Sequence, residues 1–197
     1  MSTSFKRVGL ESVQGYPGQA SAHATTITTT LNSMIKSVVE VQYFGPNAFN
    51  FKTQAGQLAE KWAEGFLTTF LNFTDAVTKS TTNISGSLGG NAVNNSFAAD
   101  AIKAPAAEPD RGFVEVETTA LDSLIGTVGG YFDAVRSEID SHMRTVESLD
   151  WAGNAQQKAI GMAQQMTATL KESANTGQTS IVDFISKQIT TVDEADV

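Results

Sequence analysis

The sequence predicts an all-α protein in which two long antiparallel helical hairpins follow in tandem and pack together as a four-helix bundle. Apolar residues recur with the three-and-four spacing of a helix face over four long stretches. A short motif with an aromatic residue and glycine interrupts these stretches once in each half. Phe44-Gly45-Pro46-Asn47-Ala48 aligns with Trp151-Ala152-Gly153-Asn154-Ala155 at an offset of 107 residues, which predicts two copies of one helix-tip-helix unit.

Composition limits the classes of function. The 197 residues are 41% hydrophobic and 17% charged, which suits a chain that buries a core. No run approaches the about 18 to 20 apolar residues of a membrane-spanning helix, and the N-terminus lacks the apolar run of a secretory signal. We therefore expect no integral membrane insertion and no classical export. The net charge of −8 argues against nucleic acid as a partner, because phosphates are neutralised by Lys and Arg.

Residues 1–21 are predicted to be an irregular N-terminal arm because they contain Gly9, Gly15, Pro17 and Gly18 with little periodicity. The first hairpin is expected over residues 22–84. Its first helix reaches Tyr43, and the β-branched threonines near its start leave a strand as the local alternative.

Gly45 and Pro46 end the first helix and allow a second to begin, because proline suits the first turn of a helix. The apolar stripe of this second helix carries most of the aromatic side chains of the chain. Such a stripe predicts a core or a partner interface, with a ligand pocket as the less favoured alternative. Residues 85–113 are rich in Gly, Asn and Pro and predict a linker, within which residues 92–103 can form a short helix.

The second hairpin is expected over residues 114–190, followed by an acidic tail over 191–197. Its first helix has the most regular apolar repeat and should be about 50 Å long. His142 falls on the apolar seam, which predicts a packed histidine with one hydrogen-bond partner in preference to a metal ligand. The last helix follows the Trp151 tip, where the Trp is expected to pack across the open end of the hairpin.

A Trp151-x-Gly153 tip between two amphipathic helices resembles the WXG-type substrates of type VII (ESX) secretion. Members of that family are small helical hairpins that pair antiparallel into four-helix bundles. The resemblance implies that two such hairpins are fused here, with Phe44-x-Pro46 as a degenerate first tip. Family members usually carry a Tyr-x-x-x-Asp/Glu secretion signal, and none of the three tyrosines in this chain has an acidic residue four positions on.

Catalytic chemistry receives no support from motifs. The chain has no cysteine, only two histidines, and no nucleotide-binding loop, zinc-protease motif or nucleophile elbow, so we expect neither an enzyme nor a cofactor or metal. Carboxylates at 60 and 64, and at 133, 138 and 140, share helix faces but lack the Glu-x-x-His motif of di-metal bundles.

Two functions remain open. The resemblance implies an ESX-like secreted or adaptor protein, exported without a classical signal peptide, that acts by protein-protein binding or homo-oligomerisation. The alternative is a structural component of a larger assembly such as a phage virion or its tail and injection apparatus. In either case the candidate partner contacts are the tip residues Phe44, Gly45, Pro46, Trp151 and Gly153.

Overall fold

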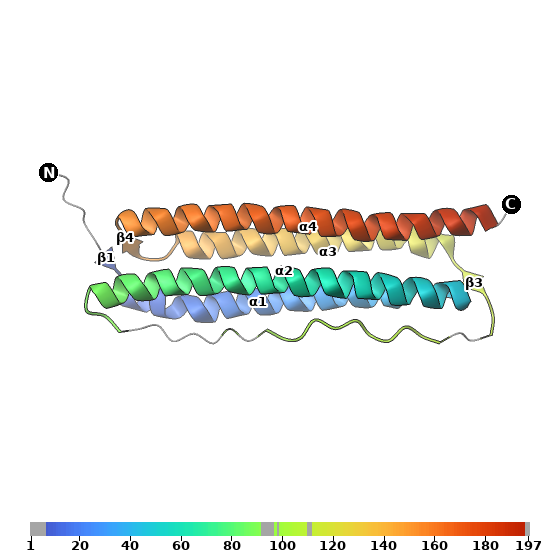
Figure 1. The fold of residues 1–197 in the computed structure, drawn as a ribbon, viewed down its shortest axis with the longest axis horizontal. Coiled ribbons are helices and arrows are strands. Elements are labelled where there is room, and N and C mark those ends of the chain that lie inside the picture. Colours follow the sequence, from blue (N-terminus) through green and yellow to red (C-terminus); the bar gives the residue numbers. More distant parts are fainter. Residues whose placement is uncertain (1–6, 92–96, 98, 110–111, 196–197) are drawn as a thin grey trace.

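The computed structural model describes residues 7–91, 97, 99–109 and 112–195, and they form an elongated bundle of helices (Figure 1). The helices in this part of the chain are α1 (Leu10–Val39), α2 (Pro46–Ser87), α3 (Thr118–Glu147) and α4 (Asn154–Ala195). The two-residue strands are β1 (Arg7–Val8), β2 (Tyr43–Phe44), β3 (Glu115–Val116) and β4 (Trp151–Ala152). The predicted fold class, two tandem hairpins in a four-helix bundle, is confirmed.

The two hairpins lie side by side and antiparallel. Each helix contacts its hairpin partner and one helix of the other hairpin, so α1 packs on α2 and α3, and α4 also packs on α2 and α3. The tip between α1 and α2 and the tip between α3 and α4 therefore lie at opposite ends of the bundle (Figure 1). One continuous hydrophobic core runs between the helices and receives side chains from all four.

Short strands tie each tip to the other hairpin. β1 pairs antiparallel with β4, and β2 pairs antiparallel with β3. Each tip thus holds the segment that leads into the first helix of the opposite hairpin. This exchange is reciprocal, as in an interface between two subunits related by a two-fold axis.

The two hairpins correspond at an offset of 108 residues, so the predicted offset of 107 is wrong. α1 and α3 each have 30 residues, α2 and α4 each have 42, and every element of the second half begins 108 positions after its counterpart. Gly45 and Gly153 both have a positive φ, +116° and +123°. This backbone equivalence makes Tyr43, and not Phe44, the counterpart of Trp151. Both tips therefore have the pattern aromatic-x-Gly, and the expectation of a degenerate Phe44-x-Pro46 tip was wrong in its register.

The predicted element boundaries need correction at both termini. Residues 10–21 are helical and not an irregular arm, although Pro17 lies inside α1. A proline in a helix interior costs about 3 kcal/mol. Val13, Tyr16 and Ala20 are fully buried in this segment, and large buried side chains contribute roughly 1.5 to 3 kcal/mol each, which offsets that cost. The hairpins therefore span residues 10–87 and 118–195, and the predicted acidic tail is helical up to Ala195.

The described part of the linker lies along α1 and α2 from one end of the bundle to the other (Figure 1). Asn32 of α1 holds it with two hydrogen bonds, since its Nδ2 donates to the Ala101 carbonyl at 3.2 Å and its Oδ1 accepts from the Lys103 amide at 3.2 Å. Between them, Ile102 is buried in the core. The short helix predicted over residues 92–103 is absent from 99–103, and most of its other residues lie outside the described ones.

Core side chains in the two halves differ in size at corresponding positions. Ala24 in α1 corresponds to Phe132 in α3, and Phe66 in α2 corresponds to Ala174 in α4, and all four are buried. Where one hairpin has a small side chain, the other has a large one at the corresponding position, and a close-packed interior accommodates such differences. The cores of the two halves are therefore not equivalent at these positions.

Candidate interaction surfaces at the ends of the bundle

The aromatic residue of each tip is buried. Tyr43 and Trp151 are each 4% exposed, and the Tyr43 hydroxyl accepts a hydrogen bond from Gln188 Nε2 of α4 at 2.9 Å. Trp151 is paired with Val8 of β1, and its indole Nε1 has no hydrogen-bond partner. Trp151 and Gly153, predicted as possible partner contacts, therefore lie at a tip whose Trp is enclosed by the chain itself.

The second tip is closed by residues around β1. Arg7 forms an ion pair with Asp150 at 2.9 Å, and the Gly9 amide donates to the Asp150 carbonyl at 2.6 Å. The Asp150 amide in turn donates to Ser12 Oγ at 2.9 Å. A Cβ added to Gly9 would lie 2.9 Å from Asp150 Cβ, so glycine permits this close approach. The second tip is thus held by hydrogen bonds and an ion pair to residues 7–12 of the other half.

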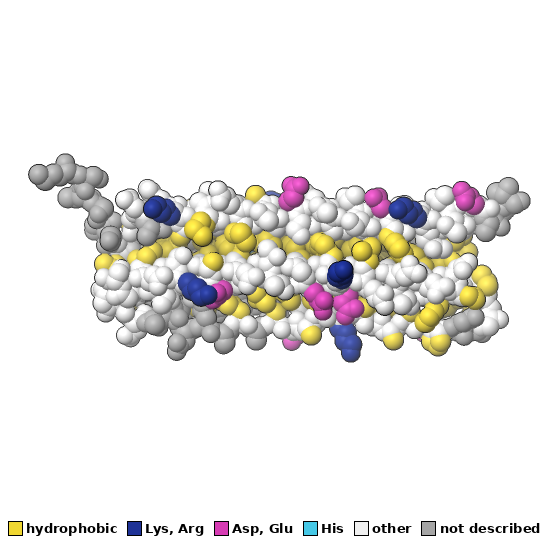
Figure 2. Space-filling model, viewed as in Figure 1, with side chains coloured by type: hydrophobic (Ala, Val, Ile, Leu, Met, Phe, Trp, Pro, Cys, Tyr) yellow, Lys and Arg dark blue, Asp and Glu magenta, His cyan; other side chains and the backbone are white. Residues whose placement is uncertain are grey.

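The first tip presents an apolar surface to solvent. The half-buried Phe44 ring lies beside the Phe113 ring, with 5.8 Å between centroids. Val114 packs over Gly45, where an added Cβ would lie 3.1 Å from Val114 Cγ2. Phe49, Phe113 and Val114 are 39%, 44% and 76% exposed. We call this surface the aromatic end; it consists of Phe44, Pro46, Phe49, Phe113 and Val114, and hydrophobic side chains gather at this end in Figure 2.

Two hollows meet at Phe44. The first has a volume of about 250 Å³ and is lined by Tyr43, Phe44, Gly45, Pro46, Asn47 and Val114. The second has a volume of about 390 Å³ and is lined by Val39, Glu40, Gln42, Phe44, Lys52, Ala106 and Glu108. In its wall the buried Lys52 places Nζ 4.8 Å from the centre of the Phe44 ring, a cation-π geometry. The first hollow contains three of the predicted site residues, Phe44, Gly45 and Pro46.

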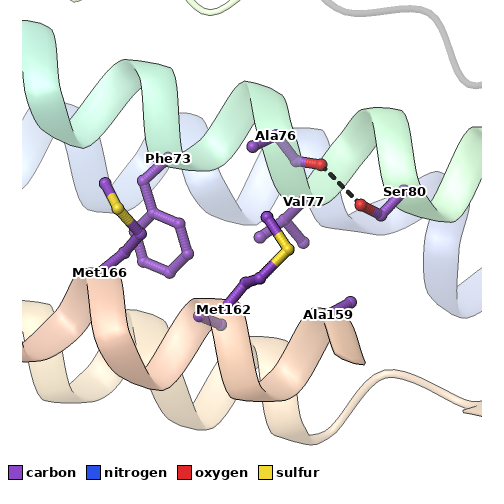
Figure 3. A pocket seen from close by; sticks show the side chains of 8 residues that line it. Phe73, Ala76, Val77, Ser80, Ala159, Met162 and Met166 are labelled. Carbon is purple, nitrogen blue, oxygen red and sulfur yellow. Dashed lines mark hydrogen bonds between the residues drawn. The ribbon is translucent and has the colours of Figure 1, made fainter. Parts of the chain in front are cut away.

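An apolar groove also lies between α2 and α4 (Figure 3). It is lined by Phe73, Ala76, Val77, Ser80, Ala159, Met162, Ala163 and Met166. Its volume of about 20 Å³ admits little more than one water-sized group. The Ser80 hydroxyl donates to the Ala76 carbonyl and is not directed at a ligand. The groove is a seam between helices and does not have the size of a ligand site.

A polar cluster is buried between α1 and α3. His142 is fully buried, and its Nε2 lies 2.9 Å from the Tyr16 hydroxyl, so the predicted packed histidine with one hydrogen-bond partner is confirmed. The rings of Phe70 and Phe73 meet its imidazole edge-on at 4.9 Å. Burial, with a smaller contribution from nearby His23, lowers the pKa of His142 to about 3, so this imidazole is neutral at physiological pH. Burial also raises the pKa of the Tyr16 hydroxyl.

His23 continues this cluster toward the surface. Its Nδ1 lies 2.6 Å from Glu138 Oε1 and its Nε2 lies 3.0 Å from Thr145 Oγ1. Sequence reasoning missed the Tyr16 and His23 contributions, because Tyr16 falls in the segment expected to be irregular. His23 lies seven positions after Tyr16, which is two helical turns, and this spacing could have indicated a helix that carries both side chains on one face. The arrangement joins α1 to α3.

The carboxylates that share helix faces are engaged separately. Asp133 pairs with Arg136 at 2.6 Å, and Asp140 pairs with Lys171 at 2.9 Å. Within the described ranges, no three residues of the metal-ligating types gather into one group. None of the described helices combines the length and hydropathy that a bilayer-spanning helix requires.

Comparisons of the chain with protein-family models, with curated proteins and with solved structures found no match. The class of protein can therefore be stated only from its fold and from the surfaces described above. The protein is an elongated four-helix bundle of two fused hairpins with reciprocal tip pairing. Its most distinctive solvent-facing feature is the aromatic end.

Proposed function

We propose that this chain is a fused pair of WXG-type hairpins that acts by binding other proteins, as an ESX-like secreted or adaptor protein, and that it is not an enzyme. The observation that carries the proposal is the correspondence of the two hairpins at 108 residues, with Tyr43-Phe44-Gly45 and Trp151-Ala152-Gly153 at matching tips. An antiparallel pair of hairpins with aromatic-x-Gly tips is the arrangement that the family resemblance implies.

The packing between the halves supports a subunit-like relationship. The strand pairs are reciprocal, and α1 packs on α3 and α2 on α4 through one shared hydrophobic core. Covalent fusion keeps such a pair assembled at any concentration, because association of the halves is intramolecular. A stable rod with distinct ends is suited to presenting binding surfaces, and its buried polar groups in the His142 cluster serve packing.

The test is native-level copurification in the source organism. We expect a chromosomally tagged chain to recover a protein partner in fixed stoichiometry, and its amount in the culture supernatant to fall when the ATPase of a type VII secretion system is deleted. A chain that sediments with virus particles in fixed copy number would favour the structural alternative. Recovery as a lone monomer, or turnover of a small molecule, would contradict both functions.

A further inference from the structure

We propose that the aromatic end binds a protein segment that presents apolar side chains flanked by lysine or arginine. This inference deepens the proposed protein-binding function and rests on it. The aromatic end carries large apolar side chains where the other tip has small or polar ones, exposed carboxylates lie around it, and two hollows adjoin at Phe44.

The residues at the two ends of the bundle can be compared position by position, because corresponding elements of the two halves form them. At the second end the counterparts of Phe44, Pro46 and Phe49 are Ala152, Asn154 and Gln157. The tip thus folds with small or polar residues at these positions. Toward the second end the exposed large hydrophobic residues are Leu10, Leu88 and Met162, none of them aromatic, within the part that the structure describes. Clustered exposed apolar side chains typically mark interaction sites, and three of the five residues of the aromatic end have small or polar counterparts.

The charge around the two ends differs in the same way. Exposed carboxylates at the aromatic end are Glu40, Glu108, Glu115, Glu117, Asp193 and Glu194, and the exposed lysines described near the same helix ends are Lys36 and Lys187. At the second end Arg7, Arg144 and Lys158 balance Glu11, Glu147 and Asp150. A surface with this surplus of carboxylates attracts cationic partners and repels anionic ones.

One pair of positions accounts for part of this difference. Arg7 and Asp150 form the ion pair at the second end, and their counterparts at the aromatic end are Glu115 and Gln42. No ion pair joins Glu115 to another described residue. The cation that neutralises the second end is thus replaced by an anion at the first. A basic side chain from a partner would restore the missing charge balance.

The two hollows on either side of Phe44 differ in the same way as the apolar and basic side chains of the proposed partner. The hollow under Val114 has apolar walls from Tyr43, Phe44 and Pro46 and suits an apolar side chain. The hollow bounded by Glu40, Glu108 and Lys52 contains more negative than positive charge. The exposed Glu115 lies opposite Phe44 in the strand register, so a guanidinium or ammonium group can pair with it while the neighbouring apolar residue of the partner occupies the first hollow.

The experiment is selection of a displayed random peptide library against the full-length protein. We expect the selected peptides to combine apolar residues with Lys or Arg and to bind more weakly at high salt. The variant Phe44→Ala/Phe49→Gln installs the counterparts from the second end and should weaken binding about tenfold or more, as loss of buried aromatic area predicts. Glu115→Arg installs the counterpart Arg7 and should also weaken binding.

The matched control is Leu10→Ser/Leu88→Ser, which removes exposed apolar side chains at the opposite end and should leave peptide binding unchanged. Circular dichroism must show all variants folded. Selection of no peptides, of peptides without basic residues, or of peptides whose binding the aromatic-end variants do not reduce would overturn the inference. So would a wild-type dimer, seen by analytical ultracentrifugation, that Phe44→Ala/Phe49→Gln dissociates, because the end would then be a self-contact.

Failure of this inference differs from failure of the proposed function. If a native protein partner copurifies equally well with wild type and with Phe44→Ala/Phe49→Gln, the protein-binding function stands and the aromatic end is not its site. If neither peptides nor a native partner bind, the protein-binding function itself is wrong.

Discussion

Gly177 in α4 provides the sharpest test of the packing between the two hairpins. A Cβ added there would lie 2.7 Å from Cδ2 of Trp62 in α2, closer than atoms can approach without movement. The Trp62 ring is also fixed on other sides, by Phe132 at a centroid distance of 4.9 Å and by a hydrogen bond from its Nε1 to the Ser173 carbonyl at 3.2 Å. Gly177→Ala must therefore displace the indole.

The expected magnitude follows from three opposing contributions. Overpacking a core costs typically about 1 to 3 kcal/mol. Loss of the indole hydrogen bond adds roughly 0.5 to 1.5 kcal/mol. Replacing glycine by alanine inside a helix returns about 1 kcal/mol. We expect Gly177→Ala to lower the free energy of unfolding by about 0.5 to 3.5 kcal/mol, measured by urea denaturation followed by circular dichroism.

Gly161→Ala is the matched control, because Gly161 lies in the same helix and an added Cβ meets nothing within 4 Å. This variant should gain stability, up to about 1 kcal/mol. Leucine occupies the position that corresponds to Trp62 in the second half, Leu170, so Trp62→Leu is a conservative way to remove the indole. In a Trp62→Leu background, Gly177→Ala should destabilise the protein much less. If Gly177→Ala stabilises the protein as Gly161→Ala does, the described contact between α2 and α4 is wrong.

Three further predictions concern other contacts. Burial lowers the pKa of His142 to about 3, against about 6.5 in the unfolded chain, so protons bind preferentially to the unfolded state. The free energy of unfolding should therefore fall as the pH drops below about 6.5, with a slope that approaches about 1.4 kcal/mol per pH unit. In acid titrations of the unfolding free energy, Tyr16→Phe/His142→Met should show a shallower loss than wild type; parallel curves would refute this. Asn32→Ala should release the linker, and limited proteolysis should then cut residues 99–104 faster than in wild type while the helices remain intact. Residues 1–98 and 99–197, expressed separately, should become fully helical only when mixed, since α1 packs on α3 and α2 on α4; two fragments that fold alone and do not associate would contradict the bundle.

Local sequence patterns predicted the number of helices and the approximate place of each tip, because these depend on neighbours in the chain. Apolar residues three and four positions apart indicated four helices, and Gly45-Pro46 indicated the first break. The start of α1 was missed because Pro17 and its neighbouring glycines disfavour a helix locally. Burial of Val13 and Tyr16, with the Tyr16 hydroxyl bonded to His142 of the other hairpin, outweighs that preference, and a distant contact of this kind leaves no local signal.

The candidate site was predicted only in part. Phe44, Gly45 and Pro46 were correctly placed at a tip, but Phe49, Phe113 and Val114 join them through folding and were not expected. Trp151 was the most conspicuous residue of the sequence, yet it is buried and paired with β1. The charge difference between the ends also required the structure, since the Arg7–Asp150 ion pair of the second end has Glu115 and Gln42 at the corresponding positions of the first.

The sequence by itself determined an all-α protein of two repeated hairpins, because helical periodicity and turn residues act over a few positions. The tertiary structure decided the 108-residue register, the pairing of each tip with the opposite hairpin, and which tip remains exposed. These features depend on which side chains from distant segments fit together in one close-packed core, and the spacing of residues along the chain does not contain that information.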